Sequence, residues 1–368
     1  MGKSILKTML TTMLLVQLVL GSSIQVDIAF SGSFEHNAAA ASLRYKQLYM
    51  DAIDYSVKYC NDKLRKHGYK INPVIHSYDE TDTMGLINDI KSFKKYNVWL
   101  IMGARRSKAI LVATKIAPDI PILSSLANAP DIYDSKYFIF SAYPPAEQFA
   151  HAMYQEIKKQ HIGNSYGIFV DIRCLSCKKF ADTIVKLNNE NKPKFYLNFA
   201  ENTPDTDDLI HIIKKTPIDY LILPNYSHDS GIVISRLSKI FPSLYFIGND
   251  SWGEINFSYL QGYDIHQNNV NAIAIRATFI SDDLEKKPIV KNFIEYSKLT
   301  TQPPASIINM ILMIDKISDD LIESKPQTRK AFINMLKQQA KTHFYTAQPY
   351  AIFHWTKGQL DFKNYVNK

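Results

Sequence analysis

The stretch VWLIMGARRS, residues 98–107, shows the building pattern of this chain in ten residues. The apolar residues 98–102 predict a buried strand. Gly103 predicts the turn that ends the strand, and a helix is expected from about Ser107. A strand followed by a tight turn and a helix is one half of a βαβ unit.

The same succession recurs along the chain. Further strands are expected at 26–30, 71–77, 120–124, 166–170, 194–199, 220–223, 244–247, 271–280 and 350–355. Expected helices lie at 43–64, 86–93, 178–187, 207–213, 231–240, 290–296 and 306–321. Strands separated by helices of this length are typical of parallel sheets, so the chain is predicted to be an α/β protein.

Two successive sets of strands and helices predict two Rossmann-like lobes with parallel sheets, joined by a three-crossover hinge. Pro144 and Pro145 interrupt the pattern and predict one boundary. The predicted crossovers lie near 140–144, 272–278 and 349–353. The predicted domains are lobe I at 24–142 plus 275–345, and lobe II at 143–274 plus 346–368.

The N-terminus predicts a cleaved signal peptide over residues 1–23. Lys3 and Lys7 precede the apolar run 9–20, and the small residues 21–23 follow it. The alternative is an uncleaved membrane anchor, but the run is short for a membrane span. No cysteine follows the run, which disfavours a lipoprotein. We therefore expect a soluble protein exported to the periplasm.

The basic charge does not indicate a nucleic-acid partner. The chain has 43 Lys and Arg against 35 Asp and Glu, a formal net charge of +8. This excess is spread in short mixed clusters, whereas a nucleic-acid-binding protein concentrates it on one face or tail.

Three cysteines allow more than one interpretation. Cys174 and Cys177 have the CxxC spacing of redox sites and of half a zinc site, but no second pair of ligands is evident nearby. A small structural disulfide or two free thiols is favoured, and both residues are expected to be dispensable for ligand binding. Cys60 lies on the apolar face of the helix expected at 43–64.

The motifs of common enzyme classes are missing from the sequence. It contains no GxGxxG after a strand, no complete P-loop, no HExxH and no GxSxG. His228 and Asp229 are adjacent and are interpreted as solvated loop neighbours rather than an acid–base pair. We expect no enzyme activity, no cofactor and no metal.

Several segments, in order, resemble those of the type I periplasmic binding proteins, the leucine/isoleucine/valine-binding group. The segments are 28–32, 78–79, 101–107, 121–130, 246–252 and 350–358. The segment 101–107 resembles the Gly-Pro-x-Ser-Ser turn of that family. Arg105 and Arg106 depart from its proline and small polar residues, and Asn128 stands where threonine is common. These departures argue against a plain branched-chain amino acid as the ligand.

The resemblance implies a solute-binding protein that captures a small polar organic ligand, amino-acid-like or carboxylate-bearing, between its lobes. Its partner would be the permease of an ABC transporter, and the protein is expected to be monomeric. The alternatives are a sensory binding protein that signals to a membrane receptor and, less favoured, an exported enzyme.

The predicted ligand-binding residues lie at the carboxyl ends of strands, where open α/β sheets bind ligands. They are Ser31, Arg105, Arg106, Ser107, Ser124, Ser125, Ala127, Asn128, Tyr226, Asp250 and Trp252. Hydroxyls, amides and arginines of lobe I are expected to hold an anionic group. Asp250 of lobe II is expected to bind an ammonium group if the ligand is an amino acid, and the two aromatic residues to cover the less polar part.

Each of these residues also has an ordinary structural interpretation. The serines suit turn hydrogen bonds, the arginines suit a solvated rim, and Asp250 suits a helix N-cap. Aromatic residues are commonly buried without touching a ligand.

Overall fold

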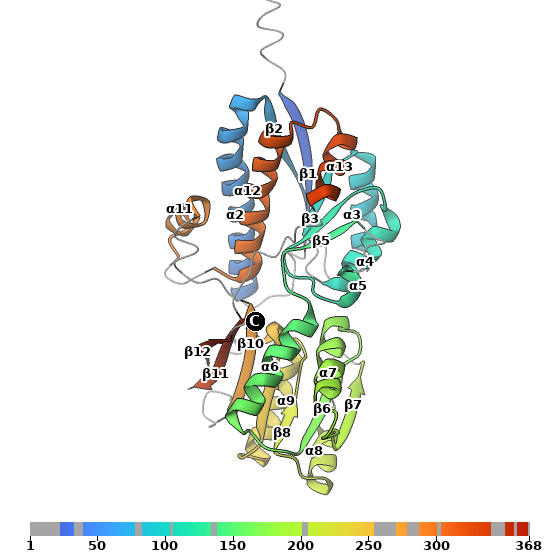
Figure 1. Ribbon diagram of the computed structural model, residues 1–368, viewed down its shortest axis with the longest axis vertical. Helices are drawn as coiled ribbons and strands as arrows, with labels where there is room; N and C mark the ends of the chain where they lie inside the picture. Colours follow the sequence, from blue (N-terminus) through green and yellow to red (C-terminus); the bar gives the residue numbers. More distant parts are fainter. Residues whose placement is uncertain are drawn as a thin grey trace, which may run out of the picture.

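The computed structural model describes most of the chain as two α/β lobes stacked end to end (Figure 1). The described residues are 23–32, 40–77, 83–103, 106–133, 138–200, 205–253, 270–277, 287–299, 303–339, 350–356 and 359–366. Apart from Ser23, the predicted signal peptide lies outside them and stays a prediction. Within these ranges, no helix combines the length and the apolar character needed to cross a membrane.

Lobe I is built on a five-stranded sheet in the order β2-β1-β3-β4-β5, with every neighbouring pair parallel. Its strands are β1 (Ile24–Gly32), β2 (Tyr69–Ser77), β3 (Leu100–Gly103), β4 (Ile122–Ser124) and β5 (Ile139–Ser141). Its helices are α2 (Ala40–Leu64), η1 (Arg65–His67), α3 (Thr83–Lys95), α4 (Ser107–Ile116), α5 (Pro130–Tyr133), α11 (Pro288–Tyr296), α12 (Ala305–Ser324) and α13 (Arg329–Gln339).

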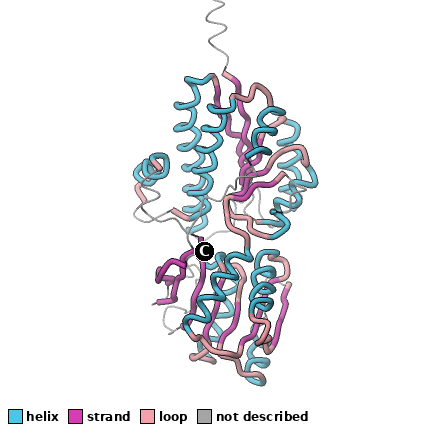
Figure 2. Tube along the Cα trace, viewed as in Figure 1, coloured by secondary structure: helices cyan, strands magenta, loops and turns pink. Residues whose placement is uncertain are grey.

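Strand β1 illustrates why this sheet is buried on both faces. Val26, Ile28 and Phe30 belong to the core cluster that contains the apolar residues of α2 and α12. Ala29 points the other way and belongs to the cluster formed with α3 and α4. Successive side chains of a strand alternate between faces, and helices cover both sides of the sheet (Figure 2).

Lobe II is built on a seven-stranded sheet in the order β12-β11-β10-β9-β8-β6-β7. Its strands are β6 (Tyr166–Asp171), β7 (Phe195–Phe199), β8 (Tyr220–Ile222), β9 (Tyr245–Gly248), β10 (Asn271–Ala277), β11 (Tyr350–Thr356) and β12 (Gln359–Val366). Its helices are α6 (Ala146–Gln160), α7 (Leu175–Leu187), α8 (Thr206–Lys215), α9 (Ser227–Ile240) and η2 (Asp250–Gly253).

The chain passes between the lobes three times, between β5 and α6, between β10 and α11, and between α13 and β11. The predicted α/β fold with two lobes is confirmed. The exact domain boundaries stay predictions, and the third predicted crossover, near 349–353, begins outside the described residues.

The sheet of lobe II has an antiparallel edge that the sequence did not predict. The sheet of lobe II is not parallel throughout, because β11 pairs antiparallel with both β10 and β12. Only two residues separate β11 from β12 in the sequence, and a connection of this length can join antiparallel strands but not parallel ones.

Strands β5 and β12 and helices α5, α6 and α13 were not predicted from the sequence. Strand β5 has only three residues, which is too short for a periodic signal. Helix α6 begins directly after Pro145, its N-cap. Proline before the first helical turn removes no helical hydrogen bond, so the prolines taken as an interruption precede a helix here.

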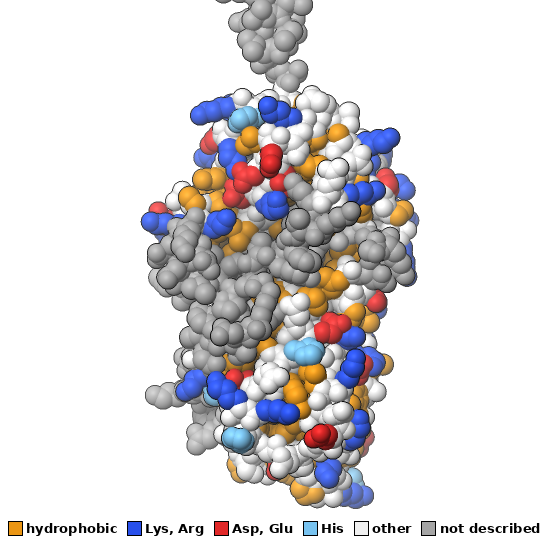
Figure 3. Space-filling model, in the orientation of Figure 1, with side chains coloured by type: hydrophobic (Ala, Val, Ile, Leu, Met, Phe, Trp, Pro, Cys, Tyr) orange, Lys and Arg blue, Asp and Glu red, His pale blue; other side chains and the backbone are white. Residues whose placement is uncertain are grey.

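The surface carries charges of both signs. On the face shown in Figure 3, Lys and Arg side chains are interspersed with Asp and Glu over both lobes.

Candidate functional site

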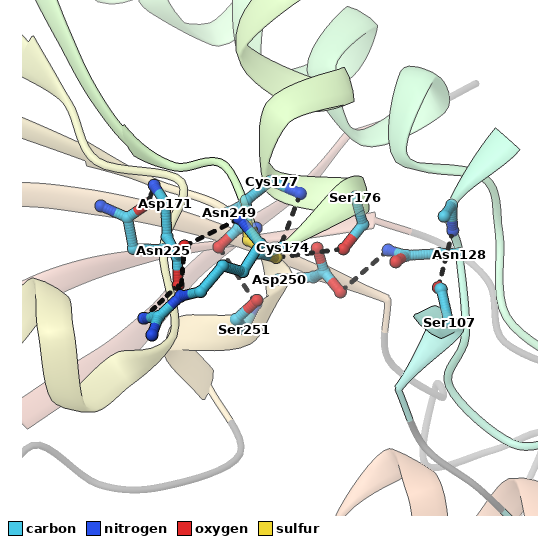
Figure 4. Close-up of a disulfide and its surroundings, with 12 residues drawn as sticks. Ser107, Asn128, Asp171, Cys174, Ser176, Cys177, Asn225, Asn249, Asp250 and Ser251 are labelled. Atoms are coloured by element: carbon cyan, nitrogen blue, oxygen red, sulfur yellow. Dashed lines mark hydrogen bonds and ion pairs between the residues drawn. A yellow bond between two sulfur atoms is a disulfide. The ribbon is translucent and has the colours of Figure 1, made fainter. Parts of the chain in front are cut away.

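The carboxyl ends of the two sheets meet where the lobes meet. Two interactions between side chains show this. Asn128 Nδ2 of lobe I donates to Asp250 Oδ2 of lobe II at 3.1 Å (Figure 4). The guanidinium of Arg106, from lobe I, lies 4.8 Å from the ring centroid of Tyr226, from lobe II. Four of the predicted residues therefore come together from both lobes.

Three serines on the lobe I side hold the loop that follows β4. Ser124 Oγ accepts from the backbone N–H of Ala127 at 3.0 Å, and Ser107 Oγ accepts from that of Ala129 at 3.1 Å. The carbonyl of Ala127 accepts from Ser141 Oγ at 2.6 Å. These bonds position the loop. They are the turn hydrogen bonds that were expected as the alternative to ligand binding by the serines.

Ser31 and Ser125 have a different environment. Their side chains are 0% and 1% exposed, and neither Oγ has a hydrogen-bond partner among the described residues. The carbonyl of Ser125 accepts from Asn309 Nδ2 of α12 at 2.8 Å, which fixes this residue against the helix. A buried hydroxyl without a partner loses its hydrogen bonds to water, so a group supplied from outside the chain would satisfy it.

Gly103 explains how β3 can end so close to Ser31. The two residues pair in the parallel register of β1 and β3. A Cβ atom at position 103 would lie 1.8 Å from the Ser31 carbonyl oxygen, and Gly103 has a φ of +116°. Only glycine fits this position.

On the lobe II side, Asp171 and Asn225 form a buried polar unit. Arg173 Nε and Nη2 donate to the two Asp171 carboxylate oxygens at 2.9 and 2.8 Å. Asn225 Oδ1 accepts from the Asp171 N–H at 2.8 Å, and its Nδ2 donates to the Phe169 carbonyl at 2.9 Å. Asn225 thereby fastens the end of β8 to β6.

A disulfide joins Cys174 and Cys177 at the start of α7, as Figure 4 shows. Cys174 is the N-cap of this helix, and its Sγ accepts from the Cys177 N–H at 3.3 Å. Of the two interpretations left open, the structural disulfide is the one observed. Leu175, the next residue, packs against the core cluster of lobe I, so this turn contributes to the contact between the lobes. The dispensability of the two cysteines for binding stays a prediction.

Asp229 is the least compensated charge of this region. Its residue is 7% exposed, and no hydrogen bond or ion pair of the described residues involves its carboxylate. Burial raises the pKa of Asp229 to about 6. His228 lowers it, Asp171 raises it, and Arg173 and Arg106 lower it.

The structure corrects the interpretation of this pair as solvated loop neighbours. Both residues lie in the first turn of α9, where His228 is exposed and Asp229 is buried. Asp171, Arg173 and Asn225 were not among the predicted ligand-binding residues. The only available signal was their position directly after predicted strands.

Trp252 is not placed as a wall of a ligand site. It is 1% exposed within the core of lobe II, and its Nε1 donates to the Leu223 carbonyl at 3.0 Å and to Ser230 Oγ at 2.8 Å. Gly248 leaves room for its ring, because a Cβ there would lie 2.1 Å from it. Trp252 supports the turn that carries Asp250. Arg105 lies outside the described residues.

A cavity of about 390 Å³ lies elsewhere in lobe II, between the ends of α6 and α7. Its lining includes Tyr220, the first residue of β8, whereas the residues described above follow the last residues of their strands. The cavity is therefore at the amino ends of the strands, away from the junction of the lobes.

Comparison with known proteins supports the fold through structure rather than sequence. A scan against known protein families and a search of curated proteins found no match. Solved structures match closely. A leucine-binding protein of Thermotoga maritima superposes with a TM-score of 0.75 at 14% identity, over 93% of this chain and 99% of that one.

Two further structures extend this comparison. A type 1 periplasmic binding protein of Bordetella pertussis matches with a TM-score of 0.73 at 12% identity, over 92% of this chain and 100% of that one. A solute-binding protein of an ABC transporter from R. palustris, in complex with 4-hydroxybenzoate, matches with a TM-score of 0.72 at 10% identity, over 93% and 96%. All three are described as binding proteins.

Proposed function

We propose that this chain, which has the fold of the type I periplasmic binding proteins, is the periplasmic solute-binding protein of an ABC transporter. Its ligand would be a small polar organic molecule with a carboxylate, bound where the lobes meet. The observation that carries the proposal is the pair of buried, unpartnered hydroxyls of Ser31 and Ser125 at that junction.

Position distinguishes these two hydroxyls from others that are buried. Ser56 and Ser238 also have an Oγ without a partner, but they lie inside α2 and α9. A helical serine can rotate its hydroxyl toward the carbonyl of the preceding turn. Ser31 and Ser125 lie at and directly after the carboxyl ends of β1 and β4, where ligands bind in open α/β sheets.

The charge of lobe I favours an anionic group. Arg106 is the residue directly before α4, and the next residue, Ser107, bonds the loop that follows β4. An arginine and neutral hydroxyls together suit a carboxylate, because the hydrogen bonds to a charged acceptor are about twice as strong as neutral ones. Arg105 would add to this charge.

Two of the related structures indicate the range of ligands. One is described as a leucine-binding protein, and one holds 4-hydroxybenzoate. Both ligands have a carboxylate, and they differ in the rest of the molecule. This agrees with a carboxylate held by lobe I and a more variable group held by lobe II, where Tyr226 and Asp250 lie.

The other site residues would act indirectly. Ser107, Ser124 and Ala127 hold the loop through the bonds described above, and Asn128 contacts Asp250 across the junction. Delivery would be to the permease of the transporter, with the binding protein as a monomer. Deletion of the gene should abolish ligand uptake, which tests delivery to the transporter. Size-exclusion chromatography should show a monomer, which tests the oligomeric state.

The binding experiment is a thermal-shift screen against amino acids and aromatic carboxylates, followed by calorimetry. A ligand far above its Kd raises stability by mass action. Ser125→Ala should weaken a carboxylate ligand by about 10- to 100-fold, the equivalent of one hydrogen bond to a charged group. Ser56→Ala, which also removes a buried unpartnered hydroxyl, should leave the Kd unchanged. Equal affinity for Ser125→Ala and wild type would contradict the proposal.

A further inference from the structure

Asp229 is a buried carboxylate at the junction of the lobes that none of the interactions described above uses. It lies in the first turn of α9, three residues after Tyr226, whose ring faces Arg106 of lobe I. Its residue is 7% exposed. A buried charge is unfavourable unless a partner compensates it.

The neighbouring groups do not supply that partner. Among the described residues, Arg173 donates to Asp171, and Arg106 lies over the Tyr226 ring. His228 is exposed on the same helix turn, and Asp171 is itself acidic. From η2, the nearby acid Asp250 accepts from Asn128. The Asp229 carboxylate has neither a hydrogen bond nor an ion pair in the described part of the chain.

We propose that Asp229 binds a cationic nitrogen group of the ligand, an amine or amidine, and that ligand capture is therefore linked to release of a proton from this carboxyl. The inference rests on the proposed function, and it adds the second charge that the ligand must carry. It assigns to Asp229 the role for which the sequence suggested Asp250.

The linkage has a definite sign. Without ligand, burial keeps the pKa of Asp229 at about 6. A bound cation favours the ionised carboxylate and lowers this pKa. Binding therefore releases a proton at acidic pH, and the affinity falls as the pH falls through 6. For a group with a pKa of about 6, the affinity at pH 5 should be about tenfold lower than at pH 7.

The experiment compares ligands that differ only in the cationic group. The probes are leucine with 4-methylpentanoate, and 4-(aminomethyl)benzoate with 4-methylbenzoate, titrated by calorimetry at pH 5 and pH 7. Wild type, Asp229→Asn and the control Asp208→Asn are compared. Asp208 is an exposed acid in the first turn of α8, so its loss should change nothing.

The expected result is that the amine of at least one pair binds to the wild type, with an affinity about tenfold lower at pH 5 than at pH 7. The acid of the same pair that lacks the amine should bind much more weakly at both pH values. Asp229→Asn should weaken the amine at pH 7 by at least tenfold and remove the pH dependence. Amine binding that is unchanged in Asp229→Asn would overturn the inference. So would a deaminated acid that binds as tightly as its amine, although the carboxylate site would then stand. If no carboxylate of either kind binds, the proposed function fails, and the inference fails with it.

Discussion

At the scale of single residues, two acids of lobe II differ in environment although both lie at the junction of the lobes. Asp250 accepts a hydrogen bond from Asn128 and is partly exposed. Asp229 is buried and has no such bond to the residues that the structure describes. A charge held in this way lowers the stability of the ligand-free protein.

The stability of the ligand-free protein should show this directly. The folded pKa of Asp229, about 6, lies above the ordinary value of 3.8, so the folded state binds its proton more tightly than the unfolded state. The stability from this group is therefore greatest below pH 4 and is lost as the pH rises to about 6. Above pH 6 the buried charge costs up to about 3 kcal/mol.

Asp229→Asn should consequently raise the free energy of unfolding at pH 7.5 by about 1–3 kcal/mol and change it little at pH 4. Urea denaturation at both pH values measures this, with Asp208→Asn as the control. A variant that is more stable but binds an amine ligand less tightly would show a functional charge. Destabilisation at pH 7.5 would instead indicate that Asp229 has a stabilising partner within the protein.

At the scale of elements, the last residue of β3 fixes how closely this strand approaches Ser31 of lobe I. Gly103 lets β3 approach the Ser31 carbonyl, and a Cβ there would lie 1.8 Å from that oxygen. Gly68, after η1, also has a positive φ, +76°, but no atom lies within 4 Å of its added Cβ. The two glycines share the backbone requirement and differ in the space around them.

Substitution by alanine should separate these two effects. Gly68→Ala should lower the free energy of unfolding by about 1–2 kcal/mol, the strain of a left-handed residue alone. Gly103→Ala should lower the free energy of unfolding by more than about 4 kcal/mol, because β1 and β3 must also separate. Thermal denaturation of the two variants measures the difference. Similar melting temperatures would mean that the strand ends adjust easily and that Ser31 is not rigidly placed.

At the scale of the whole molecule, one core cluster runs through both lobes. It contains Phe30 and Ile53 of lobe I, Phe149 and Val170 of lobe II, and Tyr143 from the connection between them. The lobes are also joined by three passages of the chain. Lobes coupled in this way should unfold together, although separate domains commonly do not.

Tryptophan fluorescence can test this coupling. Trp99 packs on Phe332 in lobe I, and Trp252 lies in the core of lobe II. The third tryptophan is replaced by phenylalanine in every variant, and each variant keeps either Trp99 or Trp252 as its single fluorescent probe. The urea transitions of the two variants should superimpose. Midpoints that differ beyond experimental error would mean that each lobe unfolds separately.

The sequence by itself determined the α/β class, the two lobes and most strands, because short-range periodicity records which face of each element is buried. It also singled out Ser31 and Ser125 as predicted ligand-binding residues, since ligand sites in open α/β sheets follow strand ends. Only the tertiary structure decided which of the predicted ligand-binding residues contact each other. Arg106 and Tyr226 are 120 positions apart, and no local pattern encodes their contact. Burial decided the rest. Trp252 and Asp229 both follow predicted strands, and the sequence does not show how their environments differ. Trp252 lies hydrogen-bonded in the core of lobe II, whereas Asp229 is a buried acid without a hydrogen bond or ion pair to the described residues.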